Sequence, residues 1–271
     1  MIIRQRSPII LRVSDQLNIM SRSLRIFSNK YMILGFCLLI GVIFRLYAIS
    51  NQGMFSRDSY TYISETQDGL MHPDHLFDPQ KGSTTPPLFL ILMHNISRFF
   101  GSVERGGLVL NFLAGIALIG VCFFGGMLVT ENVFYSGCFS FLVAVNPVLV
   151  KLSVQIQRDS CYLLCAVGAF FLFISSIKQT TLWGKIVLFF LCGALSAASM
   201  LIRFEGCEFF LLFTGSIFLI GIYQKKPWYR MLYYSLLLGI GGLCFIVLLI
   251  LFSDCSWEYL RTIFMWKYHS I

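Results

Sequence analysis

Charged residues are scarce in this sequence. Asp, Glu, Lys and Arg make up 13% of its 271 residues, whereas an average soluble domain has about 25%. Hydrophobic residues make up 57% of the chain, and 27 residues are Phe. This balance excludes an ordinary soluble fold. It predicts a polytopic membrane protein whose surplus of apolar surface faces lipid.

Several motifs of common enzymes and metal sites are also missing. The sequence contains no P-loop, no GxSxG and no HExxH. Its nine cysteines form no CxxC pair and mostly lie in apolar runs, so we interpret them as small core residues. His72 and His75 have no nearby cysteine or further histidine to complete a metal site, which favours solvated loop residues.

The net charge of +8 arises largely at the ends of apolar segments, as topology requires of a membrane protein. We therefore expect no nucleic-acid partner. Residues 1–30 contain six Arg or Lys residues and one acidic residue, Asp15, so this segment is expected in the cytoplasm. The run Tyr31–Ser50 has the length of a spanning helix, and it therefore differs from the short core of a cleaved signal peptide.

Seven apolar runs are long enough to cross a membrane. They are Tyr31–Ser50, Gly107–Val129, Val133–Val150, Ser160–Ile177, Lys185–Ile202, Gly206–Tyr223 and Met231–Phe252. The further run Pro86–Gly101 is short, and its spacing places His94, Asn95 and Arg98 on one helical face. The predicted fold is an all-α membrane bundle of about seven spans with interfacial helices in its first outer loop.

The distribution of positive charge over alternate connections predicts that Pro86–Gly101 does not cross the membrane. If it lies in the interface, the basic connections at 178–185 and 224–230 both fall inside, with the N-terminus. The prediction is a cytoplasmic segment 1–30, a transmembrane module 31–252 and an outer tail 253–271. The outer loop 51–106 holds an interfacial helix over 86–101. No internal repeat or flexible linker divides the chain further.

This topology collects three pairings of an acid with arginine on the outer side. Arg57 and Asp58 follow the first span, Arg158 and Asp159 precede the fourth, and Arg203 precedes Glu205 and Glu208 after the fifth. A single charge at a span end is most often a snorkelling anchor, and Arg45 is interpreted in that way. Tyr60 and Tyr62 are expected at headgroup level. Three clusters together also favour a shared polar site.

Carboxylates and arginines together suggest a chemistry for such a site. A carboxylate can accept a proton from an attacking hydroxyl or hold a divalent cation. Arginine offers forked donors for phosphate oxygens. At a lipid–water boundary, this combination suits a phosphorylated lipid on one side and a polar acceptor on the other.

The residues around these charges resemble the GT-C membrane glycosyltransferases, specifically the protein O-mannosyltransferase and aminoarabinose-transferase branch with its bacterial relatives. An Asp follows the first span, as Asp58 does here. "TTPPLFLILMHNISRFFG" resembles the family's interfacial helix, although Thr85 stands where His or Lys is common. "NPVLVKLSVQIQRDSCYLL" and "LSAASMLIRFEGCEFFLL" resemble the endings of its third and fifth spans.

The resemblance implies transfer of a sugar from a polyprenyl phosphate to a lipid, glycan or protein acceptor on the outer face of a bacterial inner membrane. Asp58 then matches the catalytic base, and Asp159 supports it. These two carboxylates would also hold a divalent cation if the reaction uses one. The candidate substrate-binding residues are Arg57, Arg158, Arg203, Glu205 and Lys81.

Two other functions stay open at this level. Family members usually continue past 271 residues, so the chain is also consistent with a truncated, non-catalytic scaffold of the same fold, or with one half of a site that a second chain completes. A small-solute transporter is the third alternative. Transporters usually place charges near mid-membrane, and the charges here lie at span ends.

Overall fold

The structure is a computed structural model that describes residues 8–51, 55–71 and 85–253, with side chains from Lys30 onward except that of Arg57. These residues form ten α-helices and one 3₁₀ turn, with no strand among them. The elements are α1 (Pro8–Asn51), α2 (Arg57–Met71), α3 (Pro87–Phe100), α4 (Val103–Thr130), α5 (Val133–Val145), α6 (Pro147–Val154), α7 (Asp159–Lys178), α8 (Leu182–Ile202), the 3₁₀ turn η3 (Phe204–Gly206), α9 (Cys207–Tyr223) and α10 (Trp228–Phe252).

Six helical segments are long and apolar enough to cross a membrane, and the bent pair α5–α6 makes a seventh if it counts as one span. The six are Lys30–Asn51, Val103–Thr130, Asp159–Lys178, Leu182–Ile202, Phe204–Tyr223 and Trp228–Phe252. Half or less of each span is buried inside the protein, so the remaining apolar surface is available to lipid. The all-α, multi-pass prediction is confirmed.

The third predicted span is not one straight helix, contrary to the expectation for Val133–Val150. It breaks between α5 and α6, whose axes differ by 56°. Pro147 has no N–H to continue the helix, and the Asn146 side chain accepts hydrogen bonds from the N–H groups of Val148 (2.9 Å) and Leu149 (3.2 Å). Asn146 therefore begins a new helix where the sequence pattern alone indicated continuity.

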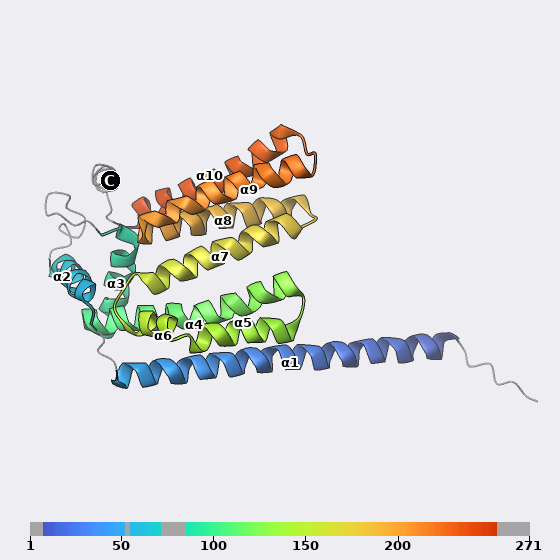
Figure 1. Cartoon of the computed structure of the whole chain (residues 1–271), viewed down its shortest axis with the longest axis horizontal. Helices are drawn as coiled ribbons and strands as arrows, with labels where there is room; N and C mark the ends of the chain where they lie inside the picture. The colour runs from blue at the N-terminus through green and yellow to red at the C-terminus, as the bar shows by residue number, and fades with distance from the viewer. Residues whose placement is uncertain (1–7, 52–54, 72–84, 254–271) are drawn as a thin grey trace, which may run out of the picture.

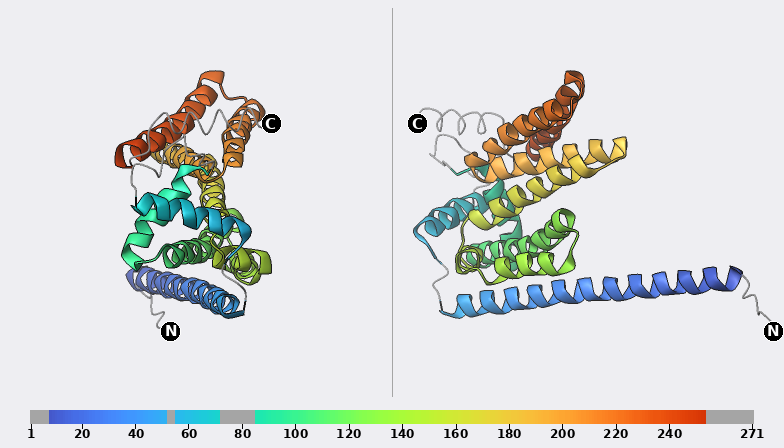
Figure 2. Two further views of the ribbon diagram at one scale, coloured as in Figure 1. Left: turned by 90° about the vertical axis from the view of Figure 1, so that its left-hand side faces the viewer. Right: turned by 45° about the vertical axis from the view of Figure 1, so that its right-hand side comes forward.

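Figure 1 shows the spans stacked in the order α1, then α4 with α5, then α7, then α8, and finally α9 with α10. Both ends of this stack are distinct (Figures 1 and 2). One, the α2–α3 end, carries α2, α3 and η3. The other, the hairpin end, carries the connections 131–132, 179–181 and 224–227, and α1 enters the stack from this side. Helix α3 is not among the helices long enough to cross a membrane, and the expectation that Pro86–Gly101 does not cross stays a prediction.

Helix α3 is held more deeply than an interfacial helix would be. Residues 85–90 are all buried, and Phe89 and Met93 belong to the largest apolar cluster, which also contains Leu110 of α4 and Leu201 of α8. The sequence placed this helix on the membrane surface. The structure instead inserts its first turn among the spans and leaves Asn95 and Arg98 exposed at its far end.

Glycines bring the spans α8 and α10 into backbone contact. A Cβ on Gly193 would overlap the carbonyl oxygen of Leu238, and one on Gly241 would overlap the carbonyl oxygen of Phe190. Lipid tails are as apolar as leucine, so membrane helices associate through close packing at small residues. This reciprocal contact fixes α10 against α8, and α8 carries Arg203 at its end.

Arg45 is not the snorkelling anchor that its position suggested. The residue is fully buried, and its guanidinium donates to the carbonyl oxygens of Gly41 (3.1 Å), Ala144 (3.3 Å) and Gly115 (3.3 Å). The Ala144 carbonyl lies in the last turn of α5, next to the break. Helix ends leave carbonyls without intrahelical donors, so Arg45 satisfies α5 at its broken end and links it to α1 and α4.

Candidate functional site

Asp58 lies in the first turn of α2, where a pair of serines fixes the start of the helix. The Ser56 N–H donates to the Ser59 hydroxyl (2.9 Å), and the Ser59 N–H donates back to the Ser56 hydroxyl (3.3 Å), the reciprocal pattern of a capping box. The Ser59 hydroxyl is buried and donates to the carbonyl oxygen of Ile156 (2.9 Å). Asp58 is exposed beside this bond, and its charge suits a helix N-terminus.

Ile156 belongs to the segment that leads into α7. The Ser59 bond therefore joins the start of α2 to the segment that carries Arg158 and Asp159. Asp159 begins α7, and its carboxylate forms an ion pair with the guanidinium of Arg203, at the end of α8. Both side chains of this pair are about a quarter exposed, at 26% for Asp159 and 29% for Arg203. The pair therefore lies at the edge of the protein interior, open to a ligand.

Arg203 contacts a second acid and an aromatic ring. Its Nη2 lies 3.3 Å from a carboxylate oxygen of Glu205, and its Nε donates to the other oxygen at 3.4 Å. The guanidinium also covers the ring of Tyr162, with its carbon 5.5 Å from the ring centroid, a favourable cation–π geometry. Gly206 permits the tight turn that positions Glu205, because a Cβ there would overlap the α8 backbone at Ser199 and Met200.

These contacts keep Arg203 charged. Burial alone lowers the pKa of the guanidinium, but the hydrogen bond and charge of Glu205, together with the charge of Asp159, outweigh burial and raise the pKa above its ordinary value. Arginine is protonated at any physiological pH. The cluster of Asp159, Arg203 and Glu205 therefore combines two carboxylates with one fixed cation.

Tyr62 connects Asp58 to this cluster. It was expected at headgroup level with Tyr60, and its side chain lies inside the protein: only 6% of the residue is exposed, and its ring packs edge-on against Phe89 of α3 at 5.2 Å. Burial raises the pKa of Tyr62, and the charges of Arg158, Asp58 and Asp159 all lie near enough to shift it. Asp58, Arg158 and Asp159 thus all lie within electrostatic range of one phenol.

The predicted site residues divide into three groups. Asp159, Arg203 and Glu205 are in direct contact. Asp58 and Arg158 are joined to them through the electrostatic surroundings of Tyr62, and through Ser59 and Ile156. The Arg57 backbone begins α2, but its side chain and all of Lys81 lie outside the described residues, as does the tail beyond 253.

No group of three or more His, Cys, Asp or Glu residues is arranged to hold a metal ion in the part of the chain that the structure describes. Asp58 and Asp159, the two carboxylates that the sequence offered for a divalent cation, have different environments here. Asp159 pairs with Arg203, whereas Asp58 is exposed in the first turn of α2.

Sequence reasoning missed three residues that build this site. Tyr162 covers Arg203, Tyr62 is buried against Phe89 within range of the charged groups, and Ser59 ties α2 to the segment before α7. One signal was available. Tyr162 lies three residues after Asp159, so the two share one face of α7. The bond from Ser59 to a main-chain carbonyl far away in the sequence had no such signal.

The fold and this cluster define a multi-pass membrane protein with an ionic site at one end of its bundle. Comparison with known proteins adds no family to that description: no family model, no curated protein and no solved structure matches the chain significantly. The function is therefore argued from the site itself.

Proposed function

We propose that the protein is a membrane glycosyltransferase that moves a sugar from a polyprenyl-phosphate carrier to a hydroxyl acceptor at the α2–α3 end. One observation carries the proposal: the pair Asp159–Arg203, with Glu205 and Tyr162 around it, lies at the same end of the bundle as the start of α2, where Asp58 is exposed. Charges at or near membrane depth are costly and usually either pair or serve a function.

The proposed reaction is an inverting displacement. The oxygen of the acceptor hydroxyl attacks the anomeric carbon from the side opposite the carrier. The bond between that carbon and the phosphate oxygen breaks, and its electron pair leaves with the polyprenyl phosphate. The proton of the hydroxyl passes to the Asp58 carboxylate, which is exposed and free to approach a bound acceptor. General base catalysis of this kind contributes about 10²–10⁴-fold.

Arg158 is the better candidate for the phosphate, and Arg203 for a positioning residue. The Arg203 guanidinium already donates to two carboxylates. Arg158 forms no ion pair with another described residue, and it lies near Tyr62, at the same end of α7 as Asp159. A guanidinium without a carboxylate partner can give both forks to phosphate oxygens and stabilise the charge that develops on the leaving group.

In this account the α2–α3 end faces the outside of a bacterial inner membrane, because the basic connections at 178–185 and 224–230 lie at the hairpin end and mark the cytoplasmic side. The donor enters from the lipid, and the acceptor enters from water. The bilayer supplies the lipid partners, and a second chain that completes the site is compatible with this arrangement.

The test is turnover by the purified protein in nanodiscs. A panel of polyprenyl-phosphate sugars is supplied with mixed membrane and soluble acceptors, and release of free polyprenyl phosphate is followed by mass spectrometry. We expect release that requires both the protein and an acceptor. If no donor in a panel of hexosyl and pentosyl carriers is consumed, and none binds, the protein is a non-catalytic scaffold and the proposal fails.

A further inference from the structure

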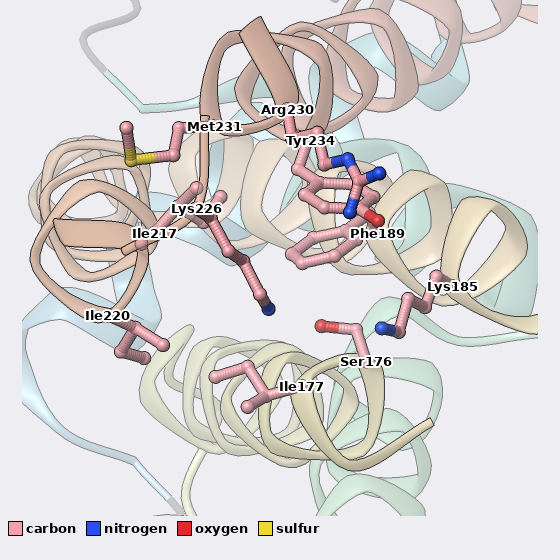
Figure 3. A pocket seen from close by; sticks show the side chains of 11 residues that line it. Ser176, Ile177, Lys185, Phe189, Ile217, Ile220, Lys226, Arg230, Met231 and Tyr234 are labelled. Carbon is pink, nitrogen blue, oxygen red and sulfur yellow. The ribbon is translucent and has the colours of Figure 1, made fainter. Parts of the chain in front are cut away.

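A second site candidate lies at the hairpin end, on the far side of the bundle from Asp159. Here α7, α8, α9 and α10 surround a cavity of about 40 Å³ (Figure 3). It lies next to a larger open hollow of about 560 Å³ that shares Lys185, Arg230 and Tyr234. None of these residues takes part in the glycosyltransferase proposal, so this cavity calls for its own explanation.

Three cations converge on the cavity. Lys185 comes from α8, Lys226 from the α9–α10 connection and Arg230 from the first turn of α10, and no Asp or Glu is among the residues that line it. Figure 3 shows the Lys226 side chain extending into the space above Ile177 of α7, and the Lys185 amine on the other side of Ser176. Like charges repel, so a bound anion would stabilise this arrangement.

The position of Lys226 is fixed by the way α9 ends. Lys225 has the left-handed φ of 51°, its N–H donates to the Ile222 carbonyl (3.0 Å), and the Lys226 N–H donates to the Gly221 carbonyl (2.8 Å). This is the bond pattern of a Schellman motif. The motif reverses the chain at Lys225, and Lys226 then lines the cavity while Lys225 is exposed.

The surroundings of Lys226 also shift the pKa of its ammonium. Burial lowers the pKa of its ammonium below the ordinary value, and the charges of Lys185 and Arg230 lower it further. A bound anion would reverse the effect of those neighbours. No carboxylate among the residues that line the cavity offsets this charge.

The remaining wall of the cavity is apolar. Phe189, Ile217 and Met231 are buried there, and the Phe189 ring stacks on Tyr234 at 4.9 Å between centroids. One bound water needs about 10–15 Å³ of such space, so a cavity of about 40 Å³ admits a group the size of a phosphate. A ligand with an anionic head and an apolar body matches both parts of this surface.

We infer that Lys185, Lys226 and Arg230 bind the phosphodiester headgroup of an anionic phospholipid from the surrounding bilayer, with its acyl chains leading from the apolar side of the cavity into the bilayer. Basic pockets between membrane helices bind such headgroups, and here the pocket opens at the level where headgroups lie, at the ends of four spans. A soluble phosphate would match the cations but would leave the apolar wall unused.

Native mass spectrometry of the detergent-purified protein tests this inference. Phosphatidylglycerol is titrated against phosphatidylcholine, and glycerophosphoglycerol, the same phosphodiester without acyl chains, is titrated separately. We expect phosphatidylglycerol to bind at least tenfold more tightly than either of the others. Equal binding of both lipids contradicts the inference, and equal binding of glycerophosphoglycerol shows a site for a soluble phosphate ester instead.

Substitutions of the residues that line the cavity test whether the lipid binds there. Each cation near a membrane surface contributes about fivefold to affinity for anionic lipid, so Lys226→Gln should weaken phosphatidylglycerol binding about fivefold and Lys185→Gln with Lys226→Gln about 25-fold. Lys226→Arg should retain it. The matched control is Lys225→Gln, which removes the same charge from an exposed neighbour that does not line the cavity. If Lys225→Gln weakens binding as much as Lys226→Gln, the inference is wrong.

Discussion

Arg203 and Asp159 are 44 positions apart in the sequence and form an ion pair at the α2–α3 end of the bundle. The pair joins the end of α8 to the start of α7, and Arg203 adds Glu205 as a second partner. The two open ends of the α7–α8 hairpin are thereby held together at the same end of the bundle as α2. The proposed active site depends on this relationship.

A double-mutant cycle measures that coupling. Asp159→Asn and Arg203→Gln each remove one charge of a partly buried pair, and we expect their destabilising effects to be non-additive by about 0.5–3 kcal/mol, as for residues in one ionic network. Thermal unfolding in detergent provides the readout. The matched control is Lys178 with Glu131, an exposed pair at the hairpin end with N and O 3.7 Å apart, where coupling below about 0.5 kcal/mol is expected. Additive effects at Asp159 and Arg203 would show that the pair does not hold α7 to α8.

Arg45 should be needed for stability. Arg45→Met removes three hydrogen bonds to main-chain carbonyls from a fully buried position. We expect a loss of about 1–3 kcal/mol, the cost of leaving buried polar groups without partners, seen as a lower unfolding temperature. The control is Leu46→Met, the next residue, which is 54% exposed to lipid and should change stability by less than about 0.5 kcal/mol. Equal effects would contradict the account of Arg45 as the cap of α5.

The α8–α10 contact should tolerate no side chain at Gly193. Gly193→Ala places a methyl group against the Leu238 carbonyl, so the helices must separate, and we expect a loss of about 1–3 kcal/mol, as for overpacking. Gly239→Ala on α10 is the control, because nothing lies within 4 Å of a Cβ there and alanine favours a helix by up to about 1 kcal/mol. Fluorescence-detected size exclusion after heating compares the two. A Gly193→Ala variant as stable as the Gly239→Ala variant would refute the close contact.

Orientation in the membrane can be read with epitope tags. A tag inserted between Gln179 and Thr180 lies at the hairpin end, and one between Gly101 and Ser102 lies at the α2–α3 end, each in a connection between helices. If the hairpin end is cytoplasmic, as its basic connections indicate, only the second tag binds antibody in spheroplasts with an intact membrane. The reverse pattern would place the proposed site inside the cell and remove it from an outer-face donor.

The sequence predicted the spans because apolar length and charge asymmetry are local signals. The same asymmetry predicted that Pro86–Gly101 does not cross. The break at Asn146 and Pro147 was also visible in residue types, but helix continuity was favoured because the flanking residues are uniformly apolar. How deeply α3 inserts could not be read, because its first turn is buried by residues of α4, α7 and α8 that lie far away in the sequence.

Only the charged residues of the site could be predicted from the sequence. The predicted topology placed Asp58, Asp159 and Arg203 on one side of the membrane, because all three lie at the outer ends of predicted spans. Which acid pairs with Arg203 depends on how α7 and α8 approach, and the burial of Tyr62 depends on α3. Arg45 was misread for the same reason: its partners are carbonyls of α4 and α5 as well as of its own helix, and carbonyls are present at every position of a sequence.

The most direct test of the central claim is sugar transfer from the polyprenyl-phosphate donor by the parent protein, by Asp58→Asn and by Asp68→Asn. The two variants remove the same charge from the same helix, but only Asp58 lies in the first turn of α2, beside the Arg158–Asp159 cluster. The account predicts that Asp58→Asn lowers turnover by at least about 10²-fold, the contribution of a general base, with donor binding retained, and that Asp68→Asn stays within about twofold of the parent. An active Asp58→Asn variant would contradict the proposed catalytic base.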